Sequence, residues 1–256
     1  MLSAELSVDY PQKKGVLRDL RIDVLPGEIV GLVGQSGSGK STLALALLQL
    51  LGHTGAKIRG RIVLLGKDLV GYSERQMRDV RGRLMSLIPQ SPVAALNPAL
   101  RIGTQMREAW RAHSRENWNS QMERVTALLA SAGLPSEESF LRRFPGEVSV
   151  GQAQRILIVM SLLHAPALLI ADEPTSALDA ITQHDVLDLI ARINTERHMS
   201  VLLISHDLLS AAGVCHRLAI LHEGLIVECG PPGQLLRSPT HPYTQRLVQA
   251  LPQWQW

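Results

Sequence analysis

The sequence predicts an α/β protein with a mostly parallel core sheet. Its strand signal lies in four continuously apolar runs, of the kind that a parallel sheet buries on both faces. These runs are EIVGLVG (28–34), LMSLIPQ (84–90), ALLIADE (167–173) and SVLLISH (200–206). Helical patterns follow the first run (GKSTLALALLQLL) and the third (TQHDVLDLIARINTER), and strands that alternate with helices are typical of α/β sheets.

Three further segments complete the predicted organisation. The early alternating segments ELSVDY and LRDLRIDVLP predict an N-terminal antiparallel β layer. Residues 97–165 are helix-rich and predict a helical subdomain inserted between the second and third core strands, while LAILHEGLIVECG predicts a hairpin around Glu223-Gly224. We therefore expect one domain over 1–256, with a core from 1–96 and 166–256 and a C-terminal tail over 232–256.

Composition narrows the class of protein. The net charge of +3 is mild and indicates general solubility, so we expect no nucleic-acid partner. The two cysteines, Cys215 and Cys229, form no C-x-x-C and exclude a disulfide framework and a four-cysteine metal site. The start lacks a signal-peptide pattern, and the longest apolar tract (156–171) is shorter than the roughly 20 residues that span a bilayer. We expect a soluble, cytoplasmic chain, unless a partner supplies a membrane part.

A phosphate-binding loop is the most specific motif. GQSGSGKST (34–42) fits G-x-x-x-x-G-K-[ST] in full, follows an apolar run and opens a helical pattern. Glycines would let backbone N–H groups approach phosphates, Lys40 would reach the β- and γ-phosphates, and Ser41 would ligate Mg²⁺. A glycine-rich turn without nucleotide is disfavoured because every required position is present. The candidate loop residues are Gly34, Gln35, Ser36, Gly37, Ser38, Gly39, Lys40, Ser41 and Thr42.

An acidic pair ends the third apolar run. Asp172 is suited to hold Mg²⁺ through water, and Glu173 to orient the attacking water or accept its proton. Alone, such a pair is more often simply solvated. Behind a complete phosphate loop, the catalytic interpretation is favoured.

Three more features accompany these motifs in order. Gln90 ends a run 50 residues after Lys40, SALD (176–179) follows Glu173, and His206 ends the fourth run; FPGEVSVGQAQR (144–155) precedes the acidic run. The ordered set resembles the ATP-binding subunits of ABC transporters over essentially the whole chain, which implies the fold of an ABC-type P-loop ATPase.

The resemblance assigns roles to single residues. It implies that Gln90 is the Q-loop residue that senses γ-phosphate and Mg²⁺, and that His206 is the switch histidine. Taken singly, Gln90 would be a polar strand end and His206 a surface or core histidine. The dimer-facing D-loop would be formed by Ser176, Ala177, Leu178 and Asp179.

The adenine contact rests on weaker signals. Tyr10 lies 24 residues before Gly34, where the family places an aromatic ring that stacks on adenine. Val16 would flank the same base. The alternative is that Tyr10, a lone tyrosine near the N-terminus, only packs.

Two tracts indicate a branch of the family. PQSPVAALNPALRIGTQMREAW (89–110) resembles the Q-loop region of peptide and nickel importers, although Ser91 and Ala95 depart from the usual acidic residue and serine. SPTHPYTQRLVQALP (238–252) is similar to the C-terminal tract of the same branch. Members often continue into a cysteine-rich tail associated with an iron–sulfur centre, which we do not expect here.

The resemblance implies an assembly. It consists of an extracytoplasmic substrate-binding protein, two membrane-spanning permease subunits and two ATP-binding subunits on the cytoplasmic face of the membrane. ATP and Mg²⁺ would be held head to tail between the two ATP-binding subunits, and hydrolysis would reset the permeases. A short permease helix would dock near Gln90 and the helical subdomain.

The motif VSVGQ departs from the usual L-S-G-G-Q signature. Val148 and Val150 replace leucine and the first glycine, whereas Ser149, Gly151 and Gln152 remain. Ser149 and Gln152 also form the pattern of a capping box at a helix start, which is compatible with N–H groups directed at a γ-phosphate. Val150 adds a branched side chain at a close-approach position. We hypothesise a heterodimer with two unequal ATP sites.

Two other functions stay open. One is an ABC-type ATPase that is not coupled to transport, as in DNA repair or on ribosomes; the absence of sustained heptads and of a second ATPase unit weighs against it. The other is a nucleotide-binding regulatory subunit with little hydrolysis, which Val150 favours. Weighing against that alternative is the presence of all the expected catalytic and binding residues: Lys40, Gln90, Asp172, Glu173 and His206.

Overall fold

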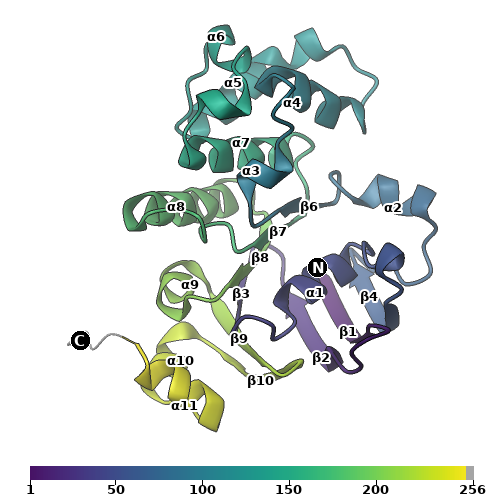
Figure 1. Ribbon diagram of the computed structural model, residues 1–256, viewed down its shortest axis with the longest axis vertical. Coiled ribbons are helices and arrows are strands. Elements are labelled where there is room, and N and C mark those ends of the chain that lie inside the picture. The colour runs from purple at the N-terminus through teal and green to yellow at the C-terminus, as the bar shows by residue number, and fades with distance from the viewer. Residues whose placement is uncertain (252–256) are drawn as a thin grey trace. The chain divides into compact units, whose positions relative to one another are not determined.

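The computed structural model describes residues 1–251 and has an α/β fold that combines strands and helices (Figure 1). The chain divides into two compact units. One consists of residues 1–73 together with residues from 193 onward, and the other of residues 74–192. No helix among residues 1–251 is long and apolar enough to cross a membrane.

The first unit contains an antiparallel sheet with the strand order β2-β1-β4-β5. β1 (Leu2–Asp9) lies between β2 (Leu17–Val24) and β4 (Lys57–Leu64), and β5 (Lys67–Asp68) pairs with the end of β4. Alternate residues of β1 are buried, as expected for a sheet with one covered face. The predicted N-terminal antiparallel layer is confirmed, and β4 adds a strand that the sequence did not predict.

The core strands of the first unit surround β3 (Ile29–Val33), whose five residues are all buried. β3 pairs in parallel with β8 (Ser200–Ser205) on one side and with β9 (Arg217–His222) on the other. β9 turns back into β10 (Leu225–Gly230), which confirms the predicted hairpin. Helices of this unit are α1 (Lys40–Leu47), η1 (Gly52–Thr54), α9 (Leu208–Val214), α10 (Pro232–Arg237) and α11 (Pro242–Gln249).

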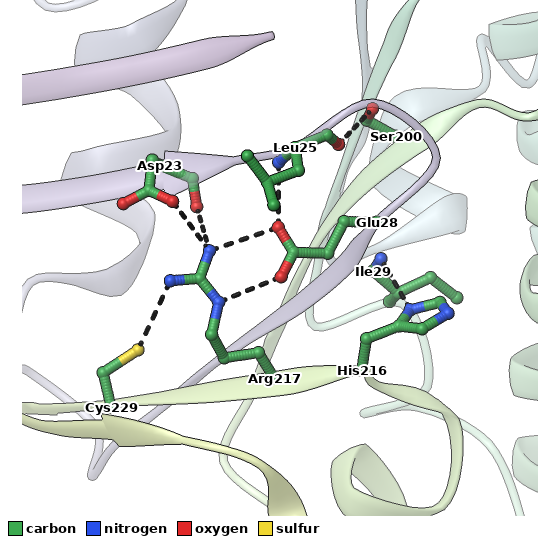
Figure 2. A network of polar contacts seen from close by, with 8 residues as sticks. All are labelled: Asp23, Leu25, Glu28, Ile29, Ser200, His216, Arg217 and Cys229. Carbon is green, nitrogen blue, oxygen red and sulfur yellow. Dashed lines mark hydrogen bonds and ion pairs between the residues drawn. The ribbon is translucent and has the colours of Figure 1, made fainter.

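Arg217 joins the antiparallel layer to the core strands of this unit (Figure 2). Its guanidinium donates to both carboxylate oxygens of Glu28, at 2.9 and 3.1 Å, and to Asp23 Oδ2 at 2.9 Å. The Glu28 side chain is only 11% exposed, and its hydrogen bond raises the pKa of Arg217 above the usual range. The ends of β2, β3 and β9 are thereby fixed to one another.

The second unit is mainly helical. Its two strands, β6 (Met85–Ile88) and β7 (Leu168–Asp172), pair in parallel. Residues 97–165, all of which the structure describes, contain helices and turns and no strand, as predicted. The helices that begin in this unit are α2 (Glu74–Val80), α3 (Pro92–Ala95), α4 (Ile102–Arg111), η2 (Trp118–Gln121), α5 (Met122–Ser131), α6 (Glu138–Leu141), η3 (Pro145–Glu147), α7 (Val150–Leu162) and α8 (Ala180–Arg197). α7 is central, because α3, α4, α5 and β6 all pack against it.

Candidate active site

The loop between β3 and α1 requires glycine at two positions. A β-carbon on Gly34 would lie 2.3 Å from the carbonyl oxygen of Leu221, which is closer than nonbonded atoms approach. Gly39 has a φ of +109°, which favours glycine, and a β-carbon there would lie 2.7 Å from Leu17 Cδ2. The backbone therefore carries no side chain at these two positions of the loop, where a phosphate-binding loop presents its N–H groups.

A buried cation lies within the same loop. The Lys40 side chain curls back, and its ammonium donates to the carbonyl oxygens of Gly34 at 2.8 Å and of Gln35 at 3.1 Å. Lys40 is 5% exposed. The hydroxyl of Ser38 is also buried and has no hydrogen-bond partner among the described residues. A buried ammonium beside an unsatisfied hydroxyl fits an anionic ligand that carries several oxygens, such as a nucleotide phosphate.

A pocket of about 410 Å³ opens beside the loop. Its lining comprises Lys13, Gly15, Val16, Arg18, Gln35, Ser36, Gly37, Ser38, His222, Glu223 and Gly224. The structure thus brings Val16, the predicted adenine flank, to the phosphate loop. Tyr10 is not among the lining residues; its N–H donates to the carbonyl oxygen of Lys13 at 2.9 Å.

The acidic pair and the Q-loop residue meet in the second unit. Ile88 of β6 pairs with Ala171 of β7 in parallel register, so the chain leaves both strands at the same sheet edge. There, Gln90 Nε2 donates to Glu173 Oε2 at 3.0 Å. Glu173 has a φ of +48°, an uncommon backbone conformation for a non-glycine residue that is frequent at functional sites.

His206 directly follows β8, at the same sheet edge at which the phosphate loop follows β3. Ser205 pairs with Val33 in parallel register, so His206 and Gly34 directly follow two neighbouring strand ends. Asp207 then caps α9, because its carboxylate accepts from the N–H groups of Leu209 and Ser210. Ser41 and Thr42 follow Lys40 in the first turn of α1.

The departing signature motif forms a regular helix start. The Ser149 hydroxyl accepts from Gln152 N at 3.2 Å, and the Gln152 side chain accepts from Ser149 N at 3.1 Å, which confirms the predicted capping box. Val150 is the first residue of α7, and 42% of it is exposed. A β-carbon on Gly151 would lie 2.7 Å from Thr182 Cγ2, so glycine is needed there for packing.

The signature motif and the D-loop line one pocket of about 490 Å³ in the second unit. Ser149, Val150, Gly151, Gln152, Ala177, Leu178 and Asp179 are all part of that lining. Asp179 caps α8, since Oδ1 accepts from the N–H groups of Ile181 and Thr182, both at 3.1 Å. Hydrogen bonds from Thr182 lower the pKa of Asp179, so this side chain is a carboxylate in the cap. Ser176 N donates to the carbonyl oxygen of Glu173, so the predicted D-loop begins as a turn directly after β7.

Comparison with known proteins identifies the family of this chain. Residues 17–176 match the family described as ABC transporter. The chain belongs to the ABC transporter family. It is 36% identical over 252 residues to the dipeptide transport ATP-binding protein DppD of Escherichia coli, covering 97% of this chain and 77% of that protein. It is 38% identical over 248 residues to the glutathione import ATP-binding protein GsiA of Salmonella choleraesuis, covering 94% of this chain and 40% of the relative.

A solved structure shows the same fold. It is a dimeric ATP-binding cassette, MJ0796, in a post-hydrolysis state with ADP and phosphate. The TM-score is 0.79 at 23% identity, covering 91% of this chain and 99% of that one. The predicted fold class of an ABC-type ATPase is confirmed. The family match and the similarity to DppD show that the chain is an ATPase that binds ATP.

Two residues of this ABC ATPase, Arg155 and Tyr243, make contacts that could not be foreseen from its motifs. Arg155 donates to Asp185 Oδ2 at 3.0 Å and to the carbonyl oxygen of Ala132 at 2.9 Å, and so ties α7 to α8 and to the end of α5. Tyr243, within the C-terminal tract, accepts a hydrogen bond from Gln35 N of the phosphate loop. The tract's H-P-Y-T pattern marked a branch of the family, but its residues carried no signal for this contact.

Proposed function

We propose that this chain hydrolyses ATP to power an importer for peptides, nickel or a related small solute. The observation that carries the proposal is the phosphate loop, with its obligatory Gly34 and Gly39 and its buried Lys40. DppD and GsiA are named for dipeptides and for glutathione, which supports short peptides as the cargo. The importer-like tracts at 89–110 and 238–252 support the same branch; Pro252 lies outside the described residues.

Lys40 and the loop N–H groups bind the β- and γ-phosphates, and the side-chain hydroxyl of Ser38 supplies a further donor. Glu173 takes the proton of the attacking water, and its hydrogen bond from Gln90 holds the carboxylate in place. His206 senses the γ-phosphate from the end of β8. Replacing Lys40 by alanine should weaken ATP binding, because it removes the buried ammonium.

When bound, Mg²⁺ would supply positive charge against the charge that develops on the phosphates. Its oxygen ligands would come from Ser41, Gln90 and Asp172, a hydroxyl, an amide and a carboxylate of the kind this hard cation accepts. Tyr10 and Val16 would contact the adenine. Of these two, Val16 has direct support, since it lines the pocket beside the phosphate loop.

The signature motif serves the nucleotide of a second ATP-binding subunit. The exposed Val150 supports this proposal, because it lines one pocket together with the D-loop. A branched side chain at this position keeps the opposing backbone at a distance. We propose that the pair is a heterodimer with unequal ATP sites, in which this chain's signature belongs to the weaker site.

Glycine at position 150 tests this inequality. In the assembled complex, Val150→Gly should change the ATPase rate or its ATP dependence. An unchanged rate and an unchanged ATP dependence would place the inequality elsewhere or remove it.

The complete assembly would contain two permease subunits and an extracytoplasmic binding protein, with this chain peripheral on the cytoplasmic face. The test is reconstitution of that complex in proteoliposomes and measurement of ATP-driven uptake of labelled dipeptides, glutathione and nickel. Uptake of one solute class that stops with Lys40→Ala supports the proposal. Failure to co-purify with any permease would favour an ABC ATPase that is not coupled to transport, and uptake without hydrolysis at this chain's site would favour a regulatory subunit.

A further inference from the structure

The C-terminal tract is fixed to the core by one carboxylate. Glu228 of β10 accepts from Thr240 N and Thr240 Oγ1, both at 2.8 Å, and from His241 N at 3.1 Å. Partial burial alone would raise the pKa of Glu228, but hydrogen bonds from the 240–244 segment lower it to about 2. The carboxylate is therefore ionised at neutral pH and holds the start of α11 in a defined place.

Tyr243 follows this anchored segment and contacts the phosphate loop. Tyr243 is 3% exposed, and its ring stacks on His222 with 3.8 Å between centroids and an interplanar angle of 16°. His241 Nδ1 accepts from Tyr243 N at 3.2 Å and fixes the first turn of α11. At the far end of the ring, the hydroxyl accepts from Gln35 N at 3.2 Å.

His222, on which Tyr243 stacks, directly precedes the turn at Glu223-Gly224, and this turn also contacts the phosphate loop. Gly224 N donates to the carbonyl oxygen of Ser38 at 3.2 Å, and Arg18 N donates to the carbonyl oxygen of Gly224 at 3.0 Å. A β-carbon on Gly224 would lie 2.5 Å from the carbonyl oxygen of Val16, so the turn packs closely against the backbone of Val16. Gln35 and Ser38, on either side of the exposed loop tip, are thus both held by hydrogen bonds from outside the loop.

We propose that Tyr243 is a positioning residue for the nucleotide site. Its hydroxyl fixes the peptide group that enters the phosphate loop, so that the following N–H groups are already oriented when ATP arrives. Pre-organisation of this kind improves affinity because less ordering is left to the binding step. The C-terminal tract then acts on ATP binding through Tyr243, although none of its described residues lines the pocket.

The inference rests on the proposed role of this loop in binding ATP, and Tyr243→Phe tests it in the purified full-length chain. The substitution removes one hydroxyl and keeps the ring that stacks on His222. We expect the Kd for Mg-ATP in calorimetry to rise about fivefold, the effect of one lost hydrogen bond of ordinary strength. Hydrogen exchange at Gln35 should become faster, while the melting temperature stays close to that of the wild type. In the assembled complex, KM for ATP should rise and kcat should stay the same.

Tyr72→Phe is the matched control, since Tyr72 is part-exposed in a turn after β5 and lies outside the nucleotide pocket. It should bind ATP as the wild type does. Wild-type affinity and Gln35 exchange in Tyr243→Phe would overturn the inference, as would an equal loss of affinity in the control. Absence of ATP binding by the wild-type chain would instead overturn the proposed function.

Discussion

Replacing Gly34 by alanine tests whether the phosphate loop tolerates a side chain at its entrance. The added β-carbon would lie 2.3 Å from the carbonyl oxygen of Leu221 and 2.9 Å from the Ser38 hydroxyl. Contacts of β-carbons below 3.0 Å are essentially never seen, so the loop must withdraw from β9 by at least about 0.7 Å. Leu221 cannot yield, because it is fully buried and its carbonyl belongs to a core strand.

Overpacking of this kind costs about 1–3 kcal/mol of folding free energy. The shifted backbone would also misalign its N–H donors, and we expect the Kd for Mg-ATP to rise at least tenfold, which corresponds to about 1.4 kcal/mol. Urea unfolding and isothermal calorimetry measure the two effects. Gly233→Ala is the control, because a β-carbon there meets nothing within 4 Å. ATP affinity of Gly34→Ala equal to that of the wild type would refute the assignment of this loop as the phosphate cradle.

Three further predictions concern stability and reactivity. Arg217→Met should lower the free energy of unfolding by about 3 kcal/mol, because it removes the ion-pair partner of the Glu28 carboxylate, which is 11% exposed. The control Arg21→Met removes an exposed ion pair and should lower the free energy of unfolding by less than about 1 kcal/mol. Equal losses of the two variants in urea unfolding would contradict this prediction. Glu228→Gln should be less stable than the wild type at neutral pH. Because the pKa of Glu228 is lowered in the folded state, this difference in stability should shrink as the pH falls from about 4.5 towards 2. A difference that persists at pH 2 would show that the ionised Glu228 carboxylate does not hold the C-terminal tract. Cys215 should resist iodoacetamide at pH 8 until the chain unfolds, because burial raises the pKa of its thiol to about 12; rapid alkylation of the native chain would show that the site is open.

The core strands were predictable because burial on both faces leaves continuous apolar runs, as in β3 and β8. β4 was missed for a local reason. Its middle residue Gly60 has a φ of +115°, and a β-carbon there would lie 2.0 Å from the carbonyl oxygen of Glu5. The glycine lets β4 approach β1 closely, but it interrupts the alternation that signals a strand.

The contacts of the candidate site were likewise predictable only in part. The capping box of Ser149 and Gln152 spans four residues, so the sequence alone contains it. The sequence placed Gln90 and Glu173 at the ends of two apolar runs, but it did not predict that these strands are parallel neighbours or that the two side chains share a hydrogen bond. The contact of Tyr243 with the phosphate loop joins residues 208 positions apart, and no local pattern encodes such a pairing.

Single-turnover hydrolysis of ATP in the assembled complex tests whether Glu173 makes this subunit a working ATPase. Glu173→Gln keeps a side chain of the same size beside Gln90 and removes the base. We predict that the variant still binds ATP and that cleavage at its site slows by about two to four orders of magnitude. Equal single-turnover rates for the wild type and Glu173→Gln would contradict the account and remove the catalytic role of this chain.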